Sequence, residues 1–142
     1  MAEGDGYLFN NFKKEVMGGT FDLDTDSIYC ALVSCATCPD KDSASLWSDV
    51  SGSEVSGSGY TAGGEALSAL ALSKDNDEDR GEWDADDVTW SSLSTTPATP
   101  THAILFSDTA SSKLIGTVYL NTVTNGGNFT LVWSASGIVN LS

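Results

Sequence analysis

Basic residues are scarce in this sequence of 142 residues. Twenty Asp and Glu side chains oppose six Lys and Arg, which gives a formal net charge of −14. Nucleic-acid binding depends on cations that neutralise phosphates, and here the few cations are spread along the sequence, so the composition argues against DNA or RNA as a direct ligand. An acidic surface is also poorly suited to anionic lipid. We therefore expect the partners to be proteins, cations or neutral molecules.

Long apolar runs and histidine are lacking as well. No stretch of about 18 apolar residues is present, so no membrane-spanning helix and no membrane partner are predicted. No basic segment followed by an apolar one opens the sequence, so we expect no secretory signal and synthesis in a cytoplasm. His102 is the only histidine, and no nucleophile-elbow sequence accompanies it. We predict no catalytic residues and expect that the protein is not an enzyme.

Three cysteines are too few for the metal sites that their spacing suggests. Cys30, Cys35 and Cys38 have the C-x4-C-x2-C spacing of three ligands of a plant-type two-iron cluster, but such a cluster, or a zinc site, needs a fourth ligand. Cys30 lies in an apolar run, where a thiol behaves as a small hydrophobic group. A disulfide between the other two is disfavoured by a reducing cytoplasm. We expect no metal, no cofactor and free thiols.

The densest run of acidic residues begins at Asp75. Together with Asp77 and Asp79 it resembles the start of a calcium-binding loop, whose ligands alternate along the chain. Arg80 then stands where that loop requires glycine, and Asp86 stands where it requires a bidentate glutamate. We predict a solvated acidic loop, with a weak cation site as the alternative.

The first 20 residues predict a short helical segment or arm. Its apolar residues recur at intervals of four and share one helix face: Leu8, Phe12 and Val16. Asp5 is a suitable N-cap, and the Gly18-Gly19 pair ends the pattern. A helix this short is marginal alone, so it packs either on its own domain or, as an arm, on a neighbouring subunit.

From Asp26 onward the pattern changes to short strands. They are expected at 28–33, 88–90, 101–106, 114–120, 129–133 and 138–141, and we also favour strand over helix for 67–72. Residues 39–64 are rich in Ser, Gly and Asp, which predicts a long surface connection with a short helix and an extended piece. We predict one domain over residues 1–142 with an all-β fold: an antiparallel, jelly-roll-like β-sandwich with a short N-terminal helix.

Five segments stand in a distinctive order: FDLDTD at 21–26, EVSGSGYTAGG at 54–64, DADDVTWS at 84–91, LIG at 114–116 and FTLVWSASGI at 129–138. In this order they resemble a group of small virion structural proteins of tailed bacteriophages, over nearly the whole chain from about residue 7. The resemblance implies a β-sandwich that coats or clamps the particle, and specifically a capsid decoration (cement) protein. It implies no catalytic residues.

A decoration protein bridges major capsid proteins on the capsid surface of a virion assembled in the cytoplasm of the bacterial host. Shell-binding proteins are used at symmetry axes, so we also expect a homodimer or homotrimer. Aromatic side chains are favoured interface anchors, and several lie outside the strands predicted for the core. These interface candidates, which ordinary packing on the domain would also explain, are Tyr7, Phe9, Phe12, Trp47 and Tyr60.

Two other functions fit the same pattern. One is a minor tail or adsorption-apparatus component of the virion. The other is a carbohydrate-binding β-sandwich module, in which exposed tryptophans stack on sugars. For the second function the side chains to consider are Trp47, Trp83, Trp90 and Trp133, of which Trp90 and Trp133 are predicted to lie in the core.

Overall fold

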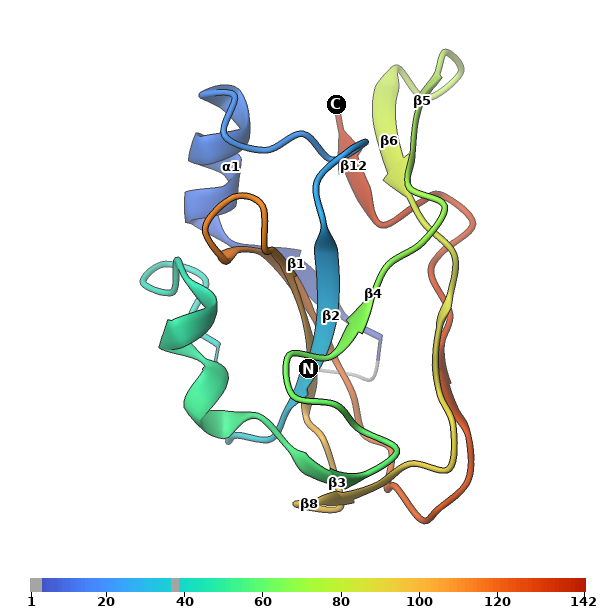
Figure 1. The fold of residues 1–142 in the computed structure, drawn as a ribbon. Coiled ribbons are helices and arrows are strands. Elements are labelled where there is room, and N and C mark those ends of the chain that lie inside the picture. Colours follow the sequence, from blue (N-terminus) through green and yellow to red (C-terminus); the bar gives the residue numbers. More distant parts are fainter. Residues whose placement is uncertain (1–3, 37–38) are drawn as a thin grey trace.

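The computed structural model describes residues 4–36 and 39–142 of the chain. Within these residues the fold is mostly β, with four antiparallel sheets and one short α-helix, α1 (Asn10–Met17), near the N-terminus (Figure 1). This confirms the predicted β-rich, antiparallel chain with a short N-terminal helix. No helix among the described residues has the length and apolar character needed to cross a bilayer.

The largest sheet has five strands. Their order across the sheet is β1 (Gly6–Leu8), β10 (Lys113–Tyr119), β9 (His102–Ser107), β2 (Ile28–Val33) and β4 (Glu65–Ala66). Every residue of β9 is buried, and β2 and β10 are buried over most of their lengths. This burial explains why all three strands appear in the sequence as apolar runs without a polar face.

Three smaller sheets complete the fold. A three-stranded sheet has the order β12 (Val139–Leu141), β6 (Arg80–Asp84) and β5 (Ala71–Asp75), while β7 (Val88–Trp90) pairs with β11 (Phe129–Leu131) and β3 (Ser56–Ser58) with β8 (Ser94–Thr96). In Figure 1, β5 and β6 lie on one side of β2, while α1 and the 3-10 helices η1 (Trp47–Asp49) and η2 (Ser51–Ser53) lie on the other.

One continuous apolar core connects these elements. The smaller sheets contribute Trp83, Trp90, Leu131 and Val139, all buried, to the same cluster as the strands of the large sheet. Trp83 donates a hydrogen bond from Nε1 to the carbonyl oxygen of Leu23 at 2.7 Å, which ties β6 to the segment that follows α1. The core therefore includes the N-terminal region.

The N-terminal helix begins later than predicted. Residues 6–8, which the helical spacing placed in the first turn, instead form β1 and pair with β10. Phe9 is the N-cap residue, without a side-chain capping bond, so the assignment of Asp5 as the cap was wrong. Pairing along β10 outweighs the weak local preference of a short helix. Gly18 does end the helix, as predicted.

The acidic stretch that begins at Asp75 is a β-hairpin rather than a loop. Asp75 pairs with Arg80 at the end of the β5–β6 ladder. Its Oδ1 accepts hydrogen bonds from the backbone N–H groups of Asp77 (3.0 Å) and Glu78 (3.1 Å), an Asx-type turn. Asp79 adopts a left-handed backbone with φ of 55°. Only residues 76–79 form the predicted exposed turn, and β6 was not predicted.

Candidate binding groove

An apolar groove of about 590 Å³ opens where the N-terminal region meets the three-stranded sheet. One wall is formed by α1 and the other by the inner face of β12, β6 and β5. The full lining is Leu8, Phe12, Lys13, Val16, Met17, Gly19, Phe21, Asp22, Leu23, Leu72, Ser73, Gly81, Glu82, Trp83, Val139, Asn140 and Leu141. Its volume and predominantly apolar lining are those of a binding site.

Strand register explains why the sheet wall is apolar and uncovered. Trp83 pairs with both Leu72 and Val139, and Gly81 pairs with Leu141, so these side chains share one face of the sheet. Trp83 and Val139 are buried, but Leu72 and Leu141 are 57% and 70% exposed. The apolar face of the sheet therefore continues beyond the part that the core covers.

Gly81 leaves the floor of this wall open. A Cβ atom added at this position would meet no heavy atom nearer than the carbonyl oxygen of Leu141, at 4.0 Å. A side chain at Gly81 would therefore project into free space between Leu72 and Leu141. The missing side chain makes the groove deeper at this point.

The helix wall ends in exposed side chains. Phe12 is buried and packs edge to face on Phe21, with ring centroids 5.0 Å apart, which holds α1 against the core. Lys13 and Met17 lie one helical turn apart and line the groove. Met17 is 82% exposed, the highest value among the large apolar side chains that are exposed in the described residues. An apolar side chain this exposed beside an apolar groove indicates a contact surface.

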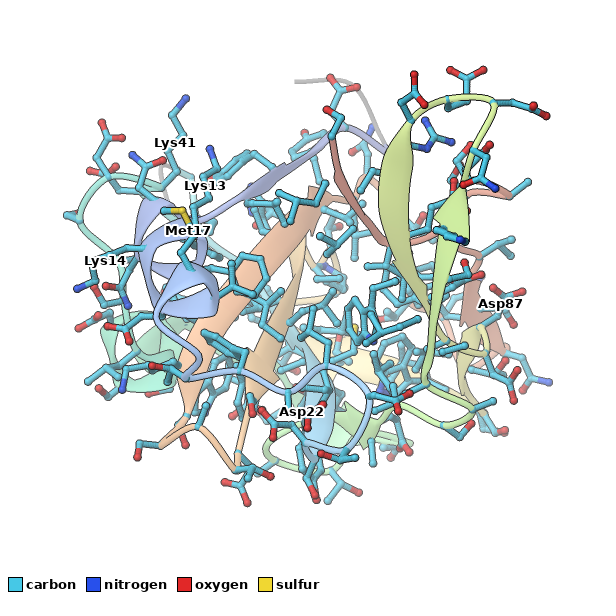
Figure 2. All side chains as sticks on the ribbon, turned by 90° about the horizontal axis from the view of Figure 1, so that it is seen from above. Lys13, Lys14, Met17, Asp22, Lys41 and Asp87 are labelled. Atoms are coloured by element: carbon cyan, nitrogen blue, oxygen red, sulfur yellow. The ribbon has the colours of Figure 1, made fainter. Side chains whose placement is uncertain are left out.

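The two walls differ in charge. Figure 2 shows Lys13, Lys14 and Lys41 around α1 on one side of the groove, and the β5–β6 hairpin on the other side. Lys41 lies beside the helix because its carbonyl oxygen accepts a hydrogen bond from Asn10 N–H at 3.0 Å. The cations are thus less scattered in space than in the sequence, and half of them surround α1.

A fourth cation lies near the same helix. Glu15 accepts a hydrogen bond from Thr20 Oγ1 at 2.7 Å and an ion pair from Lys14 at 3.2 Å. These hydrogen bonds, with the positive charges of Lys14 and Lys113, lower the pKa of the Glu15 carboxyl. The sensitivity of Glu15 to Lys113 places that side chain in the electrostatic environment of α1.

The predicted interface residues divide into two groups, and the first belongs to the core. Phe9 is fully buried and Phe12 is 2% exposed, so the expectation that they lie outside the core was wrong. Tyr7 is half-buried, packs edge to face on Phe9 with centroids 5.9 Å apart, and donates a hydrogen bond to the carbonyl oxygen of Pro39. Burial raises the pKa of Tyr7. The N-terminal segment therefore packs on its own domain.

The second group is Trp47 and Tyr60. Trp47 is half-buried and stacks on Phe106, with ring centroids 4.8 Å apart and 10° between the planes. The hydroxyl of Tyr60 accepts a hydrogen bond from Leu32 N–H (3.0 Å) and donates one to Glu54 Oε1 (2.7 Å). Burial raises the pKa of Tyr60. Both rings carry structural contacts within the chain.

Replacing Tyr60 with phenylalanine should lower the free energy of unfolding by about 1–3 kcal/mol, because two buried partners of the hydroxyl lose their hydrogen bonds. Chemical denaturation followed by tryptophan fluorescence measures this loss. Tyr119→Phe is the matched control: the Tyr119 hydroxyl has no hydrogen-bond partner among the described residues, and the ring only packs on His102. A similar stability change in both variants would refute the role assigned to the Tyr60 hydroxyl.

The remaining sequence candidates have structural surroundings. Cys30 is a buried free thiol whose pKa is raised by burial. Cys35 is disulfide-bonded, which corrects the expectation of a free thiol there, and Cys38 lies outside the described residues. His102 is buried and its Nδ1 lies 2.9 Å from Thr101 Oγ1; burial lowers its pKa. Within residues 4–36 and 39–142, no group of three or more His, Cys, Asp and Glu side chains has the geometry of a metal site.

The exposed residues of the groove were not singled out from the sequence. Met17, Leu72 and Leu141 lie at the ends of α1, β5 and β12, where a sequence pattern does not distinguish an edge of the core from an uncovered surface. The alternation of Leu72 with Lys74 was a usable signal for a strand with one apolar face. In comparisons with known proteins, no family model matches the chain, and no curated protein or solved structure is significantly similar to it.

Proposed function

We propose that this chain is a structural protein of a tailed-bacteriophage virion that decorates the capsid and stabilises it by bridging major capsid proteins. The observation that carries the proposal is the apolar groove with its exposed rim of Met17, Leu72 and Leu141. Apolar surface of this kind, in a protein with a net charge of −14, indicates attachment to other protein surfaces. The five segments that resemble small phage virion proteins supply the class of partner.

The arrangement of the sheets supports a compact clamp. We infer that the five-stranded sheet and the smaller sheets form the two layers of a jelly-roll-like sandwich. The contribution of Trp83 and Trp90 to the same core as β9 and β10 favours this arrangement. A rigid, two-layered domain can transmit load between neighbouring capsomers, and repetition over the shell supplies avidity.

The other two functions have less support. Carbohydrate modules present flat, exposed tryptophans, but Trp83 and Trp90 are each 1% exposed and Trp47 stacks on Phe106. Trp133 is half-buried, and its Nε1 donates a hydrogen bond to the carbonyl oxygen of Asp86 at 3.0 Å. Attachment at the tail uses the same physical features as attachment at the shell, so it is an outcome of the experiment below.

The purified chain should bind expanded empty heads that lack it and raise the temperature at which they come apart. Co-sedimentation measures binding, and a thermal melt of the heads measures stabilisation. Heads already saturated with the chain are the control and should take up no more. Labelling virions with an antibody against the chain then distinguishes shell from tail. Label on the tail alone, or no binding to any particle component, would overturn the decoration role.

A further inference from the structure

We propose that the groove face is self-complementary and joins two copies of this chain in a symmetric dimer, with α1 of each copy packed against the β5–β6 hairpin of the other. This inference goes beyond the proposed function, because the contact involves only the chain itself. The argument rests on three features of the face: a wall with clustered cations, a wall with clustered carboxylates, and apolar side chains between them.

The helix wall carries the cations. It consists of Lys13, Lys14, Lys41 and Met17, with Lys113 nearby. Three carboxylates accompany these lysines: Glu15, which pairs with Lys14, Asp42, which accepts a hydrogen bond from Asn10 at 2.7 Å, and Asp40. Lys13 and Lys41 form no ion pair with a described residue. The helix wall is thus free of the strong negative charge that the chain carries elsewhere.

The hairpin wall carries the carboxylates. Asp77, Glu78 and Asp79 are exposed at the turn, and Asp75 lies at its base. Two cations are present: Lys74, and Arg80, whose Nε forms an ion pair with Glu82 at 2.8 Å. The side chains of Asp77 and Glu78 form no hydrogen bond or ion pair with a described residue. The turn therefore offers carboxylates to a partner without losing internal contacts.

Apolar side chains lie between these walls. Met17 extends from the helix wall, Leu72 from the hairpin wall, and Leu141 from β12 between them. Each of the three is more than half exposed, and Gly81 leaves an opening beside the two leucines. An exposed methionine on one wall and a leucine-lined opening on the other are complementary in shape and chemistry. Packing Met17 of one copy over Leu72 and Leu141 of another would remove this apolar area from water.

A twofold rotation about an axis parallel to the groove brings the two features together. It places the helix wall of one copy over the hairpin wall of the other, and it does so twice, as an isologous contact requires. Every lysine cluster then faces a carboxylate cluster, which opposes the repulsion expected between two chains of net charge −14. A rotation about the perpendicular in-plane axis would instead place hairpin against hairpin, which the charges disfavour.

The charge pattern predicts a complementation experiment with the full chain. Variant one, Lys13→Glu with Lys41→Glu, has two acidic walls. Variant two, Asp77→Lys with Glu78→Lys, has two basic walls. Wild type should be a dimer by sedimentation velocity at low salt and should dissociate as salt rises. Each variant alone should bind itself at least about tenfold more weakly, whereas an equimolar mixture of the two should form a heterodimer.

Controls separate the contact from net charge and from misfolding. Ser58→Glu with Ser94→Glu adds negative charge on β3 and β8, at the opposite end of the molecule from α1 (Figure 1), and should leave the dimer unchanged. Met17→Asp should abolish the dimer, whereas Val132→Asp, at a side chain that is 68% exposed and outside the groove, should not. Circular dichroism checks that each variant is folded.

Three results would overturn the inference: a wild-type monomer at low salt and high micromolar concentration, a dimer that Met17→Asp leaves intact, or a variant mixture that stays monomeric. A groove that instead takes up a small amphiphile, or a segment of a capsid protein, would leave the free chain monomeric and so counts against the dimer. Because these measurements use only the free chain, the dimer can fail while binding to heads succeeds, and the reverse.

Discussion

Replacing Gly64 with alanine should lower the free energy of unfolding by about 3–5 kcal/mol, among the larger losses a single substitution causes. Gly64 has a positive φ of 83°, which a residue with a Cβ adopts only under strain. The added Cβ would also lie 2.0 Å from the carbonyl oxygen of Cys30 and 2.6 Å from Cα of Ala31. Both atoms belong to the backbone of β2, which is paired on both sides and cannot move aside. Chemical denaturation monitored by tryptophan fluorescence measures the loss.

The neighbouring Gly63 is the matched control. Its φ of 92° is just as unusual, but a Cβ there would meet no atom within 4 Å. Gly63→Ala should therefore show only the backbone strain, about 1–2 kcal/mol. The difference between the two variants measures the close approach of the 61–64 turn to β2. Equal losses would mean that the loop can shift away from β2 and that Gly64 does not fix its position.

The central strands could be predicted because their burial is recorded in composition. β2, β9 and β10 are apolar runs, and each was expected within one or two residues of its observed bounds. Gly18 likewise ended the helix where a glycine was expected to do so. In these places local sequence and tertiary packing favour the same structure, so sequence patterns were sufficient.

The errors occur where long-range pairing decides the structure. β1 is three residues long and exists because β10 offers a paired edge more than 100 residues away. β6 contains Arg80, Glu82 and Asp84 and has low strand propensity, but Trp83 anchors one of its faces in the core. No pattern in the sequence distinguishes such an acidic strand from a solvated loop. Only the alternation of buried and charged residues around Trp83 suggested it.

The candidate site was the hardest feature to predict. Aromatic side chains were chosen as interface candidates because they were outside the predicted strands, but Phe9 and Phe12 fill the core between α1 and the large sheet. The exposed apolar side chains are instead Met17, Leu72 and Leu141, each isolated in sequence and grouped only by the fold. Similarly, the lysines cluster because Lys41 packs beside α1. A binding face built from distant segments leaves no local signal.

Trp83→Ala should be the other strongly destabilising substitution, with a loss of about 3–5 kcal/mol. The side chain is 1% exposed, so its removal leaves a large cavity in the core. It also removes the hydrogen bond from Nε1 to the carbonyl oxygen of Leu23, which fixes the segment after α1 against β6. Because this segment lines the groove, Trp83→Ala should weaken self-association as well as folding. Denaturation and sedimentation velocity on the same preparation measure both effects.

Trp83→Phe and Trp90→Phe separate the hydrogen bond from the volume of the ring. Both tryptophans are 1% exposed, but Nε1 of Trp90 meets no acceptor within the part of the chain that the structure describes. Trp83→Phe leaves the Leu23 carbonyl without its donor, and Trp90→Phe removes a buried polar group that was already unpaired. Trp83→Phe should therefore cost about 1–3 kcal/mol more than Trp90→Phe. A larger loss at Trp90 would mean that the Leu23 contact does not position the helix side of the groove, and that the packing of Phe12 on Phe21 alone holds it.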